Sequence, residues 1–93
     1  MNFASMHNYY ERLVFDYINR QLIDQYEDMD EEFFLDVACY SLSKLPARYI
    51  RHEIDMMFFL TPEEEEKMDL MVSETIQAAA QFIYGKIKQA GVA

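Results

Sequence analysis

The sequence predicts an all-α protein, a small helical chain with three main helices and a short or irregular segment after Pro46. Three observations support this fold class. Only two Gly and two Pro occur among 93 residues. The long segments are rich in Met, Leu, Glu, Gln, Lys and Ala, which favour helices. Apolar residues recur at three- and four-residue steps. Because typical domains run from about 50 to 250 residues, we treat residues 1–93 as a single helical domain.

The first helix is predicted from about Ser5 to Leu22, with Ser5 as its N-cap. An amphipathic stripe supports this assignment. Its members are Met6, Tyr10, Leu13, Val14, Tyr17 and Ile18. The acidic stretch DQYEDMDEE then forms a solvated joint to the next helix.

The second helix is predicted to start near Asp30, where two glutamates follow that suit the positive end of a helix. It ends near Ser43 or Lys44, because Pro46 disfavours helical geometry at the residue before it. We also place Cys39 in the core, since free cysteines are among the most buried residues. The predicted buried face comprises Phe33, Phe34, Val37, Ala38, Ser41 and Leu42.

The segment from Ala47 to Leu60 allows two structures. It can continue as a helix after Pro46, or it can start in an extended conformation and become helical later. The residues that fit a helix are Ile50, Ile54, Met57 and Phe58.

The last helix has the clearest local signal in the chain. Thr61 is suited to the N-cap, Pro62 to the first helical position, and Glu64 to closing a capping box. The helix ends near Gly91. Its run of three alanines, residues 78–80, allows close approach of a helix from a second subunit. Together with the apolar fraction of 52%, this predicts a homodimer. The apolar stripe comprises Met68, Val72, Ile76, Ala79, Ile83 and Ile87.

Composition argues against several classes of function. One cysteine and two histidines, with no nucleophile–base pair, no Gly-rich phosphate loop and no metal motif, argue against an enzyme and against a metal site. The longest apolar run, Met56 to Leu60, is far too short to span a membrane. A net charge of −9 argues against direct DNA binding. We expect a cytoplasmic location.

One stretch departs from this acidic character. No Asp or Glu occurs between Val37 and His52, although the chain has 17 acidic residues. On a helix-like turn its three cations would share one face, whereas an extended crossing would spread them. The candidate ligand-binding residues are Lys44, Arg48, Tyr49 and Arg51.

These candidates suggest phosphate and base binding. Arg48 is suited to grip a phosphate bidentately, Lys44 adds a point charge, and Tyr49 or Tyr40 can stack on a base. The alternative is that the cations neutralise nearby acidic side chains as surface salt bridges.

The stretch DVACYSLSKLPARY, residues 36–49, resembles the signature of the late competence development protein ComFB family, D-V-x-A-x-x-L-N-x-L-P-P-x-Y. The chain departs from it at Cys39, Ser43 and Ala47, which stand where the family has Ala, Asn and Pro. The matching positions are Asp36, Val37, Leu42, Leu45, Pro46 and Tyr49.

The resemblance implies a small helical domain, usually dimeric and linked to competence. It also implies a receptor for cyclic dinucleotides, above all cyclic di-GMP. Among the four candidate residues only Tyr49 falls on a signature position. Some family members hold zinc through cysteines just ahead of the motif. Here that region reads DMDEEFFL and has no cysteine, so zinc is not expected.

Two hypotheses follow. The first is a cytoplasmic, dimeric, non-enzymatic receptor that binds a cyclic dinucleotide and passes the signal to an unknown downstream protein. The alternative is a helical protein–protein interaction module with no small-molecule ligand. Its working surface would include Met56, Met57 and Phe59.

Overall fold

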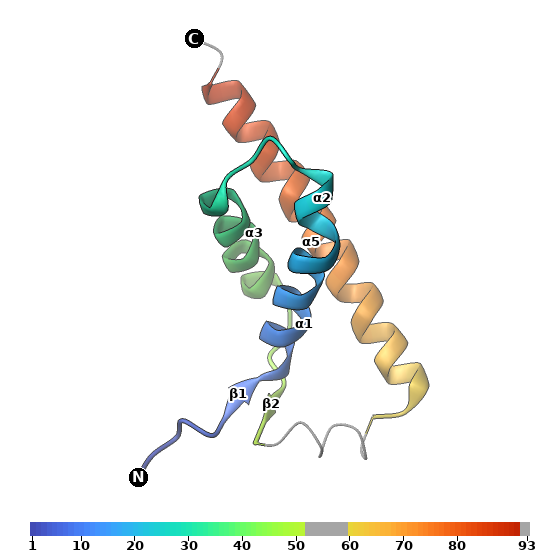
Figure 1. Ribbon diagram of the computed structural model, residues 1–93. Helices are drawn as coiled ribbons and strands as arrows, with labels where there is room; N and C mark the ends of the chain where they lie inside the picture. The colour runs from blue at the N-terminus through green and yellow to red at the C-terminus, as the bar shows by residue number, and fades with distance from the viewer. Residues whose placement is uncertain (52–59, 92–93) are drawn as a thin grey trace.

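The computed structural model describes residues 1–51 and 60–91, of which 72% are helical (Figure 1). The prediction of a mostly helical fold is confirmed, and a two-stranded sheet is added to it. The elements are β1 (His7–Asn8), α1 (Tyr9–Tyr17), the π-helix η1 (Ile18–Leu22), α2 (Ile23–Gln25), α3 (Glu31–Lys44), β2 (Tyr49–Ile50) and α5 (Pro62–Ala90).

The N-terminal helix starts later than the sequence predicts. Asn8, not Ser5, is its N-cap, and the Asn8 side chain accepts a hydrogen bond from the backbone N–H of Tyr10 (3.2 Å). Residues 7–8 are extended because they pair with β2. The helix then runs through α1, η1 and α2 without a break and ends at Gln25 instead of Leu22.

The second helix agrees with its prediction. The Asp30 carboxylate accepts a hydrogen bond from the backbone N–H of Phe33 (3.2 Å) and caps α3. The helix ends at Lys44, and Leu45 before the proline has an extended backbone. The placement of Cys39 in the core is wrong: its side chain is exposed, because the helical turn points the neighbouring Ala38 inward instead.

After α3 the chain crosses in an extended form. Tyr49 and Ile50 form β2, which pairs antiparallel with β1, His7 opposite Ile50 and Asn8 opposite Tyr49. Of the two structures that the sequence allows after Pro46, the extended start is therefore the observed one. The proposed helical positions Ile54, Met57 and Phe58 lie outside the described residues.

The last helix confirms Thr61 as its N-cap and Pro62 as its first residue. The Thr61 hydroxyl accepts a hydrogen bond from the backbone N–H of Glu64 (3.1 Å), and Pro62 is the first helical residue. At the other end the backbone N–H of Gly91 donates to the carbonyl of Ile87 (2.8 Å). The helix is 29 residues long, and the N-terminal helix and α3 pack against its middle part (Figure 1).

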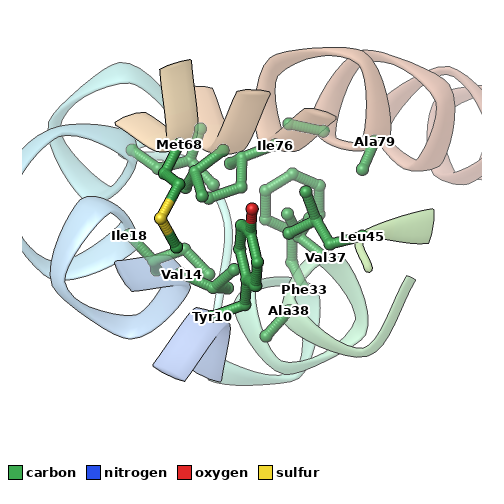
Figure 2. Close-up of a cluster of buried hydrophobic side chains, with 13 residues drawn as sticks. Tyr10, Val14, Ile18, Phe33, Val37, Ala38, Leu45, Met68, Ile76 and Ala79 are labelled. Atoms are coloured by element: carbon green, nitrogen blue, oxygen red, sulfur yellow. The ribbon is translucent and has the colours of Figure 1, made fainter. Parts of the chain in front are cut away.

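The core lies where the three helical segments meet, and Figure 2 shows its side chains converging from all of them. Val14, Phe33 and Ile76 are at most 1% exposed, one from each segment. Helix α3 runs antiparallel to α5, with Phe33 near Tyr84 and Tyr40 beside Phe82. This antiparallel contact decides which side chains of the two helices meet at the surface.

Candidate functional site

The cations of the acid-free stretch are all at the surface. Lys44 is the last residue of α3, while Arg48 and Arg51 flank β2. Within residues 1–51 and 60–91, none of the three lies within ion-pair distance of a carboxylate. The salt-bridge interpretation of these cations therefore has no support in the described part of the chain.

The backbone of Arg48 is held in place while its side chain faces solvent. Its N–H donates to Asn8 Oδ1 (2.9 Å), and its carbonyl accepts from the N–H of Tyr9 (2.7 Å). The crossing strand is thus tied to the start of α1, so the Arg48 side chain projects from a fixed point.

The extended crossing separates the candidate residues. Tyr49 is 67% exposed, and Ile50 beside it is buried, as expected for a strand with one covered face. Of the two arrangements that the sequence allows for Lys44, Arg48 and Arg51, the extended crossing is therefore the observed one. The structure leaves Lys44 on α3 and the other candidates on the strand segment.

Lys44 belongs to a group of stacked side chains across α3 and α5. Its Nζ lies 5.1 Å from the centroid of the Tyr40 ring. Tyr40 stacks on Phe82 of α5, with centroids 5.5 Å apart and ring planes inclined by 23°. Lys86 Nζ lies 5.5 Å from the Phe82 ring on the same helix. We call Tyr40, Lys44, Phe82 and Lys86 the ring–lysine platform.

The platform borders an open groove of about 360 Å³. Two alanines of α5, Ala78 and Ala79, leave room between the helices because their side chains are small. A groove of this volume lies at the small end of ligand sites. It is lined by Tyr40, Lys44, Glu74, Thr75, Ala78, Ala79 and Phe82.

A nucleobase can replace a lysine ammonium on a ring of this platform, because the two contacts differ in strength. An exposed cation–π contact contributes about 0.5–1 kcal/mol. Stacking of a nucleobase on an aromatic ring contributes about 1–3 kcal/mol. A nucleobase that replaces the ammonium on the ring therefore forms the stronger contact, and the displaced ammonium is available to a phosphate.

A second aromatic–lysine pair on α5 has a different surrounding. Lys88 Nζ lies 5.0 Å from the Tyr84 ring and 3.3 Å from Asp28 Oδ2. The Tyr84 hydroxyl donates to the same carboxylate oxygen (2.9 Å). The Tyr84 ring also packs on Tyr26, with centroids 5.2 Å apart. These contacts hold the segment between α2 and α3, which contains Tyr26 and Asp28, against the C-terminal part of α5.

Ionisation in this second pair follows from these contacts. The hydrogen bond from Tyr84, with that from Lys88 beside it, holds the pKa of Asp28 below its ordinary value. The hydrogen bond to Asp28 raises the pKa of Lys88. Burial, and then the nearby Tyr84, raise the pKa of Tyr26. Asp28 and Lys88 are therefore both charged near neutral pH.

Sequence reasoning missed Phe82 and Lys86. Their signal is the spacing: an aromatic residue precedes a lysine by four positions in Tyr40–Lys44, Phe82–Lys86 and Tyr84–Lys88. Residues four apart on a helix meet on one face. The spacing alone does not reveal that Tyr40 stacks on Phe82, because that contact depends on the pairing of α3 with α5.

A second groove, of about 400 Å³, is apolar and lies between the N-terminal helix and α3. Phe15, Ile23 and Leu35 on its walls are 40–52% exposed. Among residues 1–51 and 60–91, no cluster of three or more His, Cys, Asp or Glu has metal-site geometry. No helix in these ranges is both long and apolar enough to cross a membrane.

The fold and the site define a small helical protein with exposed cations beside an aromatic stack. Its sequence matches the profile of the late competence development protein ComFB family over residues 7–86. The chain belongs to this family, and the match includes the strand segment and the whole platform. Membership indicates a regulatory role related to competence. Neither the curated proteins nor the solved structures gave a significant match.

Proposed function

We propose that this protein is a non-enzymatic receptor for a cyclic dinucleotide, cyclic di-GMP first among them. The observation that carries the proposal is the group of exposed cations in the acid-free stretch. Lys44, Arg48 and Arg51 have no carboxylate partner among the described residues. A cyclic dinucleotide has two phosphates and two purine faces, so it needs a few cations and rings and not a basic protein.

Each candidate residue has a role in this proposal. The Arg48 guanidinium binds a phosphate through two parallel hydrogen bonds, and its fixed backbone limits the entropy lost. Lys44 supplies a point charge to a phosphate. Tyr49 is exposed enough to stack on a purine. Arg51 adds a cation to the same segment.

A labelled cyclic di-GMP tests the role of Arg48. We expect fluorescence anisotropy to show saturable binding, weakened about tenfold or more by Arg48→Ala, because a hydrogen bond to a charged group is lost. Arg20→Ala removes an exposed arginine from η1 and serves as the matched control. Equal affinity for both variants and the original chain would remove Arg48 from the site.

We further propose that the receptor is a homodimer whose helices repack when the ligand binds, which changes the surface shown to a downstream protein. Its exposed apolar side chains support self-association: Phe15, Leu35 and Leu70 are 47–58% exposed. Sedimentation velocity should show a dimer, and Leu35→Glu should shift it toward the monomer. A chain that stays monomeric at high concentration would contradict this part.

The apolar groove favours a second candidate function, a helical interaction module without a small ligand. An amphipathic partner helix could place its apolar side chains between Phe15, Ile23 and Leu35. The residues that the sequence suggested for this surface, Met56, Met57 and Phe59, lie outside the described residues. This alternative predicts that nucleotides do nothing while Leu35→Glu abolishes a protein complex.

A further inference from the structure

We infer that the ring–lysine platform is a nucleotide subsite with approximate two-fold symmetry, in which each ring–lysine pair contributes one ring face and one ammonium to the binding of a cyclic dinucleotide. This inference rests on the proposed function, since it names further residues for the same ligand. It adds Phe82 and Lys86 of α5, which lie outside the signature stretch, to Lys44 and Tyr40 within it.

The symmetry follows from the two helices. Helices α3 and α5 run antiparallel where Tyr40 stacks on Phe82. Two antiparallel helices are related by a two-fold axis perpendicular to both. Each helix places its lysine four residues after its ring, so the axis between the rings exchanges Tyr40–Lys44 with Phe82–Lys86. The ring-to-lysine distances, 5.1 and 5.5 Å, are correspondingly similar.

A cyclic dinucleotide made of two identical halves has the same symmetry. Its two phosphates lie on opposite sides of a ring of sugars and phosphates, and its two bases project on either side. One half of the ligand can therefore meet Lys44 and Tyr40 in the way that the other half meets Lys86 and Phe82. A ligand with a single nucleotide uses only one half of the platform.

The platform is open to such a ligand. Phe82 is 50% exposed, Tyr40 is half-buried, and both lysines are exposed. Within the described residues neither lysine has a carboxylate within ion-pair distance, so each is available to a phosphate. When the ammonium moves from the ring to the phosphate, the ring face that it covered becomes free for the base.

The two halves are not equal. The groove of about 360 Å³ lies on the Lys44 side, where Ala78 leaves room for a base. Tyr40 of α3 lies beside Phe82 of α5, and the two helices are antiparallel. Asp36, four residues before Tyr40, is therefore on the side of Lys86, four residues after Phe82. Its negative charge lowers the positive potential at Lys86. Glu74 in the lining of the groove lowers the positive potential on the Lys44 side as well, so the room beside Ala78 is what distinguishes the two halves. Lys44→Gln should weaken binding at least as much as Lys86→Gln.

The test is calorimetric titration of the full chain with cyclic di-GMP. We expect Lys86→Gln and Phe82→Ala each to weaken binding about tenfold, because a contact to phosphate or a stacked base is lost. Lys88→Gln is the matched control. Lys88 is also an α5 lysine that lies over an aromatic ring, but its ammonium already forms an ion pair with Asp28. The affinity of this variant should stay within about twofold of the original chain.

The outcomes separate this inference from the proposed function. If the original chain binds and Lys86→Gln has the same affinity as Lys88→Gln, the platform is not the subsite, while the receptor proposal stands. If the original chain binds no nucleotide although circular dichroism shows it folded, the receptor proposal fails and this inference with it. Because Lys86 is exposed, its variant tests the platform even if Phe82→Ala impairs folding.

Discussion

Two aromatic–lysine pairs, two residues apart on α5, have the same local structure and different surroundings. In the pair Tyr84–Lys88, both polar groups contact Asp28, and the ring packs into an aromatic cluster. In the pair Phe82–Lys86, the ring stacks on Tyr40 and no described carboxylate lies within ion-pair distance of the lysine. We call Tyr84–Lys88 the closed pair, because its hydroxyl and its ammonium both contact Asp28. We call Phe82–Lys86 the open pair, because its ring is 50% exposed and its lysine has no described carboxylate within ion-pair distance.

The same spacing in the sequence therefore gives two pairs of side chains with different contacts. Both pairs arise from the same helical geometry, which brings residues four apart together. What differs is the neighbour supplied by another segment: the joint between α2 and α3 in one case, α3 itself in the other. Of the two lysines, only Lys86 has no described carboxylate within ion-pair distance.

The largest effect is expected where the closed pair meets the core. Phe33 is 1% exposed, contacts Tyr26 at a centroid distance of 5.2 Å, and lies edge-on to Tyr84. Phe33→Ala should lower the free energy of unfolding by about 3–5 kcal/mol, through lost burial and a cavity. Urea denaturation measures this loss. Phe82→Ala, at a half-exposed ring, should cost much less, and equal costs would contradict the division into closed and open pairs.

A smaller effect on the stability of the fold is expected at low pH. The lowered pKa of Asp28 means that the folded chain binds this proton less tightly than the unfolded chain. The contribution of Asp28 to stability is therefore complete well above its ordinary value of 3.8 and is lost as the pH falls below it, through the folded-state pKa. Thermal melts should show Asp28→Asn less stable than the original chain at pH 7, with the gap closing in acid.

The control for this acid effect is the open pair. Lys86→Gln should leave the melting temperature almost unchanged at both pH values, because Lys86 has no described carboxylate partner within ion-pair distance. A gap between Asp28→Asn and the original chain that persists unchanged to low pH would show that the Asp28 charge does not stabilise the fold.

The smallest effect concerns a single hydroxyl. Tyr84→Phe keeps the ring that packs on Tyr26 but removes the donor to Asp28. The pKa of Asp28 should then move up toward its ordinary value, because the leading cause of its depression is gone. Titration followed by carboxyl carbon NMR measures the shift. An unchanged Asp28 titration in this variant would assign the lowered pKa to Lys88 and the backbone hydrogen bond instead of to Tyr84.

The sequence predicts the parts of the fold that local chemistry decides. Asp30 caps α3, Thr61 caps α5, and Pro46 fixes the end of α3, because each acts on residues within one or two turns. The start of α1 was misplaced at Ser5 for the opposite reason. Asn8 caps the helix while it also bonds Arg48, which is 40 residues away, and this pairing is not visible from either segment alone.

In the candidate site, too, the sequence predicts what depends on neighbouring residues and does not predict what depends on contacts between distant segments. The absence of acidic residues around Lys44 and Arg48 is a property of the sequence, and both side chains are exposed in the structure. Phe82 and Lys86 were missed because they join Lys44 only through the packing of α5 on α3. Cys39 was misplaced by a general preference for burial, although its neighbour Ala38 occupies the inward position of that turn.

The most direct test of the account is calorimetric titration of the original chain with cyclic di-GMP, with cyclic di-AMP and GTP as comparisons. The account predicts saturable heat at a stoichiometry near one ligand per subunit or per dimer, and weaker binding of GTP, which lacks the two-fold symmetry of the cyclic dinucleotides. No heat with any of the three, from a protein that circular dichroism shows to be helical, would contradict it.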